Sequence, residues 1–241
     1  MKGIRTWVQF PSPPPLLIKL YKNKDKDMNK IIYLVRHSGP FVKINGYDKL
    51  PFEDQSKNMI LSVDAEIKAE KLGKIPEFNN IDAVYCSNSA RAIATAKYIA
   101  FQNNDISLNV EDELNERKFG VKYIEELPDC FIQKQFDDDS YKLENGESLK
   151  EVNFRIKKYL ENEILSCNNY SKVAIVMHGI AIMTYLKNFC NVTFNNDVFK
   201  VTYNNKVIYN SVLKAPEVFK LEFDDKNNVV DIENIKVGEK L

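Results

Sequence analysis

Short apolar runs alternate with stretches of helical periodicity along most of this chain. The runs 31–35 (IIYLV) and 173–177 (VAIVM) are continuously apolar and rich in β-branched residues. Such runs are typical of strands that are buried on both faces of a parallel sheet. The pattern therefore predicts an α/β protein in which parallel strands are separated by helices.

Four helices and a hairpin follow from spacing and capping signals. A helix is expected to begin at Ser62 and end near Gly73 and Pro76, and residues 81–100 are expected to form a strand, a turn with Ser87 as the cap, and a helix. Ser148 and Glu151 form a capping box before a third helix, and a fourth runs from His178 to about Phe189. The segments 218–223 and 229–235 predict an antiparallel hairpin at a sheet edge. The inward faces of the first and third helices are predicted to be Ala65, Ala69, Leu72, and Leu149, Val152, Ile156, Leu160, Ile164.

The first 27 residues do not fit the pattern of a folded domain. The segment 10–15 (FPSPPP) breaks helices and strands, and the charged run 21–27 (YKNKDKD) is typical of a solvated segment. We expect residues 1–27 to be a disordered tail or a misassigned start, and residues 28–241 to form a single domain. Within it, the loop 41–58 is expected to wall a pocket, and the segment 121–145, with Asp137, Asp138 and Asp139, to form a lid or surface excursion.

Composition excludes several classes of function. Lys and Arg together number 34, as do Asp and Glu, so no overall field attracts the chain to nucleic acid or to an anionic membrane. No apolar run reaches the length of a membrane helix. The four cysteines show no metal-ligand spacing, which favours reduced thiols and a cytoplasmic location.

The two histidines of the chain occupy matching positions. His37 follows Arg36 at the end of one apolar run, and His178 follows the other run. Ligands of parallel sheets bind at the carboxyl ends of the strands, so these side chains are placed for an active site. An imidazole there could attack phosphorus, donate a hydrogen bond or ligate a metal. The alternative is that both histidines only pack in loops.

Two further charged residues have open interpretations. Arg91 falls in the first turn of a predicted helix, where a cation opposes the helix dipole and needs a nearby anion. A bound phosphate would supply that anion, and so would a carboxylate of the chain. Glu116 lies in a predicted loop, where it could act chemically or simply pair with Arg117 or Lys118 at the surface.

Five motifs in order resemble the histidine phosphatase superfamily, in the branch that contains the cofactor-dependent phosphoglycerate mutases. They are Arg-His at 36–37, S-x-x-x-R-A-x-x-T-A at 87–96, LNERKFG at 114–120, GES at 146–148 and His-Gly at 178–179. The resemblance implies a three-layer α/β/α fold with a mostly parallel central sheet. It also implies a phosphohistidine intermediate.

The resemblance also implies a role for each site residue. His37 would be the nucleophile, and Arg36, Arg91 and His178 would hold the phosphoryl group. Glu116 would protonate the leaving oxygen and then activate water. Because these groups supply the electrostatic stabilisation, we expect no metal and no cofactor. GES is expected only to cap the following helix.

The sequence departs from the family pattern at three positions. Ser38 stands where a glycine usually follows the histidine, which is costly if the turn needs a positive φ. Met177 replaces the serine that usually precedes the second His-Gly and would remove a hydroxyl from the pocket floor. The Thr-x-x-Asn after the first motif is missing, with Asn45 as a shifted equivalent at best.

We therefore predict a metal-independent phosphomonoester hydrolase that works through phospho-His37 on a small phosphorylated metabolite. The alternatives are a phosphoglycerate-type mutase and a catalytically impaired phosphate-binding or scaffold protein. The acidic run at 137–139 would disfavour a doubly phosphorylated substrate and hence the mutase. Neither nucleic acid nor membrane is expected as a partner. The natural substrate and a homo-oligomeric state are left open.

Overall fold

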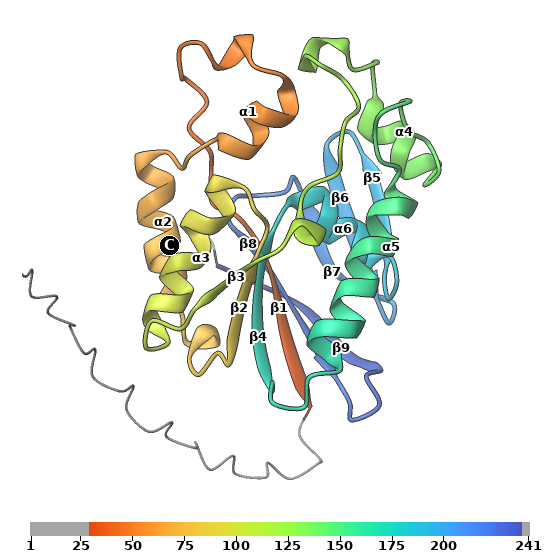
Figure 1. Cartoon of the computed structure of the whole chain (residues 1–241). Coiled ribbons are helices and arrows are strands. Elements are labelled where there is room, and N and C mark those ends of the chain that lie inside the picture. The colour runs from red at the N-terminus through yellow and green to blue at the C-terminus, as the bar shows by residue number, and fades with distance from the viewer. Residues whose placement is uncertain (1–28, 238–241) are drawn as a thin grey trace, which may run out of the picture.

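The structure, a computed structural model, describes residues 29–237 and is built on a six-stranded sheet (Figure 1). Its strand order is β3-β2-β4-β1-β8-β9. The first four strands of this order run parallel, and β8 and β9 are antiparallel at one edge. The strands are β1 (Lys30–Arg36), β2 (Ala83–Cys86), β3 (Leu108–Val110), β4 (Lys172–Met177), β8 (Glu217–Phe223) and β9 (Val229–Ile235).

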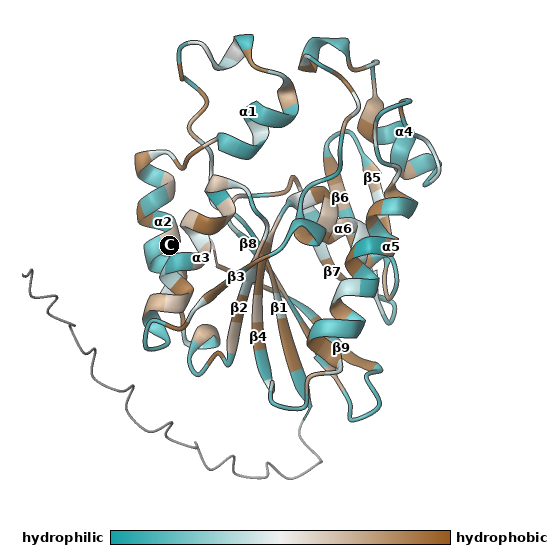
Figure 2. Cartoon of the chain, in the orientation of Figure 1, coloured by the Kyte–Doolittle hydropathy of each residue, from teal (hydrophilic) through white to brown (hydrophobic). Residues whose placement is uncertain are grey.

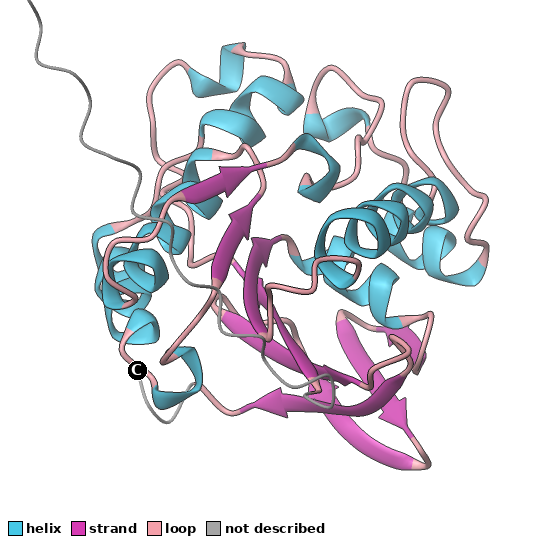
Figure 3. Cartoon of the chain, turned by 60° about the horizontal axis from the view of Figure 1, so that its bottom comes forward, coloured by secondary structure: helices cyan, strands magenta, loops and turns pink. Residues whose placement is uncertain are grey.

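Helices cover both faces of this sheet, which confirms the expected three-layer α/β/α architecture (Figure 3). Helices α2 (Val63–Gly73) and α3 (Ala90–Gln102) pack on one face. Helices α5 (Leu149–Tyr159), which continues into a π-helical turn η5 (Leu160–Leu165), and α6 (Gly179–Leu186) pack on the other. Along β1, Ile32 and Leu34 face one layer while Tyr33 and Val35 face the other, as the alternation of a strand requires.

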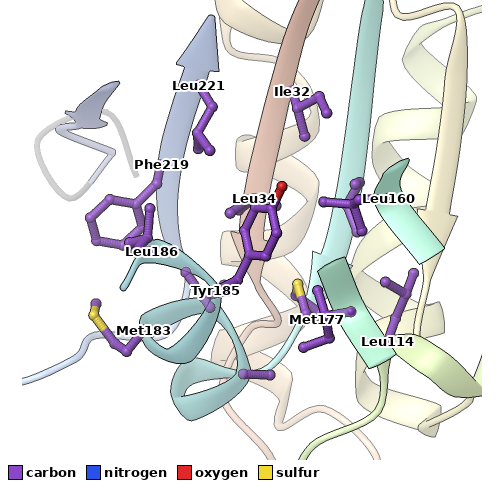
Figure 4. Packing of buried hydrophobic residues seen from close by; sticks show 14 of the residues in the cluster. Ile32, Leu34, Leu114, Leu160, Met177, Met183, Tyr185, Leu186, Phe219 and Leu221 are labelled. Carbon is purple, nitrogen blue, oxygen red and sulfur yellow. The ribbon is translucent and has the colours of Figure 1, made fainter. Parts of the chain in front are cut away.

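The larger core lies between the sheet and the α5–α6 layer. Figure 4 shows Leu34 of β1, Met177 of β4 and Phe219 of β8 beside Tyr185 of α6. All four side chains are almost fully buried. Figure 2 shows the corresponding hydropathy, with hydrophobic strands inside and hydrophilic residues on the outer faces of the helices. Burial of this apolar surface fixes the central strands and therefore their carboxyl ends.

Most helix boundaries follow the sequence signals. The Ser62 hydroxyl accepts a hydrogen bond from the amide of Ala65, and Ser148 and Glu151 form the predicted capping box. The residues expected on the inward faces of these two helices are buried. The prediction that Ser87 caps α3 is wrong, because Ser89 stands at the N-cap. Helix α6 ends at Leu186, earlier than expected.

The segments expected to be irregular contain short elements. The loop 41–58 forms η1 (Tyr47–Lys49) and the helix α1 (Phe52–Asn58), and the segment 121–145 forms η4 (Ile124–Glu126) and α4 (Phe131–Asp137). The predicted edge hairpin is confirmed as β8 and β9. The other elements are η2 (Pro76–Phe78), η3 (Asp112–Leu114) and a separate antiparallel sheet of β5 (Asn191–Asn195), β6 (Val198–Tyr203) and β7 (Lys206–Ser211).

The expectation that residues 1–27 are a tail or a misassigned start lies outside the described residues. Within residues 29–237, no helix combines the length and the apolar character needed to cross a bilayer.

Lys30 ties the beginning of β1 to the end of the α5–η5 helix. Its side chain is buried, and its Nζ donates hydrogen bonds to the carbonyls of Ile164 at 2.9 Å, Leu165 at 2.6 Å and Cys167 at 2.9 Å. The last carbonyls of a helix have no partner within the helix. Lys30 therefore satisfies the end of this helix and fixes it against the sheet.

We expect Lys30→Met to lower the free energy of unfolding by about 1–3 kcal/mol, because the carbonyls lose their common donor while the apolar stem is kept. Urea unfolding at neutral pH measures this difference. Lys68→Met, on the exposed side of α2, is the matched control and is expected to change stability by less than about 0.5 kcal/mol. Equal stability of the two variants would contradict the role of Lys30.

Candidate active site

The carboxyl ends of three neighbouring strands converge at the upper end of the sheet in Figure 1. His37 follows β1, His178 follows β4, and Ser87 follows β2. The hydrogen-bond ladder between β1 and β4 continues beyond the end of β1, because the amide of His37 donates to the carbonyl of Met177 at 3.0 Å. The two imidazole rings consequently meet edge to face, with their centroids 5.1 Å apart.

Arg91 lies between the two histidines. Its Nε donates to Nε2 of His37 at 2.9 Å, and its Nη2 donates to Nδ1 of His178 at 3.1 Å. The side chain is 7% exposed, and burial lowers the pKa of the guanidinium to about 10, so it stays charged at neutral pH. The structure thus brings both imidazoles and this guanidinium to one point.

The hydrogen bonds of His37 define its tautomer. Nδ1 lies 2.7 Å from the carbonyl oxygen of Ser38, which can only accept, so Nδ1 carries the proton. Nε2 then presents its lone pair to Arg91. Burial, together with His178 and Arg91, holds the pKa of His37 well below its ordinary value, which keeps the ring neutral. A neutral ring with a free Nε2 lone pair is the form that can act as a nucleophile.

His178 carries the opposite tautomer. Its Nδ1 accepts from Arg91, so the proton resides on Nε2, which donates to the Ser87 hydroxyl at 2.8 Å. Ser87 therefore orients an imidazole and does not cap α3. Burial, followed by the charges of Arg91 and Arg36, lowers the pKa of His178 well below its ordinary value.

Arg36 approaches the same place from β1. Its Nη1 donates to the carbonyls of Leu213 at 2.6 Å and Lys214 at 3.1 Å, in the connection between β7 and β8. Its Nε is buried and has no hydrogen-bond partner. A Cβ added to Gly179 would lie 3.3 Å from this nitrogen. Arg36 is thus anchored at one nitrogen, while its buried Nε has no hydrogen-bond partner within residues 29–237.

The turn after His37 does not require a glycine. Ser38 is fully buried and does not have a positive φ. Its amide donates to the hydroxyl of Thr95 at 3.0 Å, and its own hydroxyl donates to the carbonyl of Ala65 at 2.8 Å. Thr95 in turn donates to the carbonyl of Arg91 at 2.8 Å. The serine therefore connects the turn to both α2 and α3, and the cost expected from a positive φ does not arise.

Glu116 lies at the N-terminus of α6, beside His178. One carboxylate oxygen accepts from the amide of Arg117 at 3.0 Å and the other from the amide of Ile180 at 3.3 Å. The Arg117 guanidinium is 3.6 Å away. The pairing with Arg117 expected in the alternative interpretation exists, but only 18% of the Glu116 side chain is exposed, so it is not a surface ion pair. Glu116 lines the cavity that opens over the histidines.

The motifs at 114–120 and 146–148 are joined by close backbone packing. Gly120 has φ 79°, and a Cβ there would lie 2.4 Å from the amide nitrogen of Gly146. Glu147 accepts from the amide of Lys118 at 2.9 Å. These distances require glycine at both crossing positions. The GES segment therefore caps α5 and also supports the loop that carries Glu116.

Arg155 completes this support and was not predicted from the sequence. It forms a two-pronged ion pair with Glu147, at 2.8 and 3.1 Å, and donates to the carbonyls of Glu113 and Glu116. The sequence signal that could have indicated its role is its position on α5 between the buried residues Val152 and Ile156. An arginine on the inward face of an amphipathic helix needs a buried partner.

A cavity of about 420 Å³ is lined by His178 and Arg91 and opens to the surface. Six carboxylate residues and five Lys or Arg residues line it, and of the predicted site residues Arg91, Glu116 and His178 are among the lining side chains. Arg36 and His37 are not among the lining residues, although His37 accepts a hydrogen bond from Arg91. Asn45 is exposed and does not belong to the lining, so it does not act as the expected shifted equivalent.

Of the two expectations for the segment 121–145, a lid or a surface excursion, the acidic run 137–139 fits the second. Asp139 pairs with Lys187, Asp138 bonds Ser140, and Asp137 accepts from Gln133. None of the three lines the cavity. The carboxylates that do so, apart from Glu116 and Glu147, belong to α1 and η3: Glu53, Asp54, Asp112 and Glu113. Among residues 29–237, no group of three or more His, Cys, Asp or Glu side chains is arranged to hold a metal ion.

Comparisons with known proteins agree with this geometry. The family model of the histidine phosphatase superfamily (branch 1) matches residues 32–210. A search of curated proteins found no match.

Solved structures share the fold at low identity. A phosphoglycerate mutase from Bacillus anthracis is 18% identical, with a TM-score of 0.60 over 88% of this chain and 95% of its own. A putative alpha-ribazole-5'-P phosphatase from Escherichia coli is 15% identical, with a TM-score of 0.59 over 86% and 97%. A mycobacterial glucosyl-3-phosphoglycerate phosphatase is 15% identical, with a TM-score of 0.58 over 86% and 100%.

The hydrogen bonds predict two neutral histidines with opposite tautomers. Because the sequence contains only His37 and His178, imidazole resonances in a tag-free protein report on these two rings alone. We expect neither to titrate near pH 6.5, and ¹⁵N shifts to place the proton on Nδ1 of His37 and on Nε2 of His178. A midpoint at or above pH 6.5 for either ring would contradict this arrangement.

The lowered pKa values of His37 and His178 also predict how the free energy of unfolding depends on pH. As pH falls below about 6.5, histidines of the unfolded chain take up protons that the folded chain does not. The free energy of unfolding is therefore expected to fall as the solution is acidified through this range. His178→Asn removes one of the two titrating groups, so its free energy of unfolding should decrease less on acidification. Chemical denaturation at several pH values measures this difference.

Proposed function

Because the chain belongs to branch 1 of the histidine phosphatase superfamily, we propose that it is a phosphomonoester hydrolase that works through a phosphohistidine on His37. The observation that carries the proposal is the unprotonated Nε2 of His37, which faces a buried guanidinium and a second imidazole. A phosphoryl group placed there has a nucleophile on one side and hydrogen-bond donors around it.

The first half of the reaction transfers the phosphoryl group to the enzyme. Nε2 of His37 attacks phosphorus, an N–P bond forms, and the P–O bond to the leaving group breaks. Arg36 and Arg91 stabilise the negative charge on the nonbridging oxygens. Glu116, which takes up the proton of a monoanionic substrate, gives it to the leaving oxygen. His178 holds an oxygen of the transferred group once its Nδ1 is also protonated, a change that a bound dianion favours. The product alcohol then leaves through the cavity.

The second half returns the enzyme to its starting state. Glu116, now a carboxylate, takes a proton from water while the water oxygen attacks phosphorus. The N–P bond breaks, inorganic phosphate forms, and Nε2 regains its lone pair. No step of this sequence requires a metal ion, because the arginines supply the positive charge. Metal independence is part of the proposal.

The charges of the cavity support a small, singly phosphorylated substrate. Glu116 pairs with Arg117 and Glu147 pairs with Arg155. The four further carboxylates from α1 and η3 outnumber the three remaining lining cations, Lys57, Arg91 and Lys118. A substrate with a second phosphate would bring more negative charge beside these groups. The carboxylates that line the cavity, and not the run at 137–139, therefore favour hydrolysis over a mutase that retains a doubly phosphorylated intermediate.

We expect His37→Ala to lower turnover of an aryl phosphate by at least about a thousandfold, because the covalent step loses its nucleophile. Rapid acid-free quenching with ³²P-labelled substrate should trap a base-stable, acid-labile phosphoenzyme in the unaltered protein and none in the variant. Equal rates for the two proteins would exclude catalysis by His37.

Glu116→Gln tests the proton transfer separately. In the first turnover it is expected to slow release of the alcohol from an alkyl phosphate by about 10²–10⁴-fold, and release of nitrophenolate much less, because nitrophenolate leaves without a proton. Only the first turnover isolates the acid role, because water activation is shared by both substrates. Glu113→Gln, a neighbouring cavity residue, is the matched control. An equal loss for both substrates would contradict the general-acid role.

The alternatives give different products. A mutase would convert 2- and 3-phosphoglycerate into one another with little release of phosphate, whereas a hydrolase in H₂¹⁸O releases phosphate with one ¹⁸O. A non-catalytic binding protein would bind inorganic phosphate, seen as shifts of the two histidine resonances, without turnover of any ester.

A further inference from the structure

Arg91 is held from two sides by different parts of the protein. Toward the strand ends, its Nε and Nη2 donate to the two imidazoles. Toward the surface, its Nη1 donates to the backbone carbonyl of Ser56, and its Nη2 also donates to the Ser56 hydroxyl at 3.2 Å. Ser56 belongs to α1, and it was not among the residues singled out by the sequence.

The orientation of the guanidinium follows from these contacts. Nε and Nη2 form one edge of the planar fork, and such an edge matches two oxygens of a phosphoryl group. In Arg91 this edge faces the lone pairs of His37 and His178, where the transferred group must lie for Nε2 to attack phosphorus. Ser56 occupies the opposite side and prevents the plane from turning away.

We propose that Ser56 is a positioning residue for phosphoryl transfer, which fixes the plane of Arg91 so that its Nε–Nη2 edge faces the phosphoryl group. The inference rests on the proposed function. When the phosphoryl group enters, Arg91 exchanges the two imidazole lone pairs for two phosphoryl oxygens and keeps both contacts to Ser56. A donor that is already oriented needs little reorganisation in the transition state.

The surroundings of Ser56 explain why this contact is needed. No residue of α1 is buried, so the helix has no apolar anchor in the core. At its beginning, the Phe52 amide donates to the carbonyl of Lys122 at 2.8 Å, Glu53 accepts from the amide of Phe119 at 2.9 Å, and the rings of Phe52 and Phe119 are 4.9 Å apart. Near its C-terminal end, α1 contacts Arg91 of α3 through Ser56. Helix α1 thus connects Arg91 to the segment 119–122 and lines the cavity between them.

The test compares three variants of the full chain. Ser56→Ala removes the hydroxyl, Ser56→Thr keeps one, and Gln55→Ala alters the neighbouring residue, whose side chain bonds the carbonyl of Leu50 and not Arg91. Inorganic phosphate is the probe for binding, and its dissociation constant is measured from the histidine resonances. A nitrophenyl phosphate is the substrate for kcat and KM. Alanine favours helix, so the first variant is expected to fold.

We expect Ser56→Ala to weaken phosphate binding and to lower kcat/KM by about tenfold each, the size of one hydrogen bond to a charged group. Ser56→Thr should restore most of this loss, and Gln55→Ala should leave both quantities unchanged. Unaltered phosphate affinity and kcat/KM in Ser56→Ala would overturn the positioning role, and so would an equal loss in Gln55→Ala.

The outcomes separate this inference from the proposed function. If the unaltered protein neither hydrolyses phosphate esters nor binds inorganic phosphate, the proposed function fails, and the role of Ser56 fails with it. If the unaltered protein is active and the Ser56 variants are indistinguishable from it, only the positioning role is lost.

Discussion

A buried guanidinium bonded to neutral partners is the interaction on which the site depends. Within the described part of the chain, the hydrogen bonds of Arg91 go to two imidazoles and to Ser56, and none goes to a carboxylate. Removing a charge from water is costly unless a counter-charge or several dipoles compensate it. Here the dipoles compensate only in part, so the site gains most when a dianion binds. In the proposed function, a bound phosphate would supply the counter-charge that Arg91 lacks among the described residues.

The topology of the sheet makes this arrangement available. Strand β4 lies between β1 and β2, so three segments distant in sequence end side by side. Each delivers one part of the site: His37 after β1, His178 after β4, and the turn with Ser87 and Arg91 after β2. The core that fixes these strands is continuous on both faces of the sheet. Stability of the core and geometry of the site are thus set by the same residues.

The sequence predicted the parts that depend on local periodicity and on strand ends. The alternation of apolar runs and capped helices predicted parallel strands separated by helices, and the two histidines marked the carboxyl ends of β1 and β4. The three-layer arrangement came from the resemblance to the family. It failed where partners come from distant segments. Ser87 looked like a cap because the sequence places it before a helix, but the fold places it beside His178. Ser56 gave only a weak signal because its partner Arg91 lies 35 positions away in the chain. For Arg155, the nearby partner Glu147 was available, but the carbonyl of Glu116 that it also supports lies 39 positions away.

The two unusual residues next to the histidines do not disturb the proposed phosphate pocket. Met177 is fully buried in the apolar cluster beside Leu34 (Figure 4), so its side chain fills core and not the pocket floor. Ser38 bonds outward to α2 and α3, and its carbonyl fixes the proton on Nδ1 of His37. A backbone carbonyl is supplied equally well by glycine or serine. Ser38 and Met177, which motivated the alternative of an impaired phosphate-binding protein, therefore leave His37, Arg91 and His178 in the arrangement that the proposed catalysis requires.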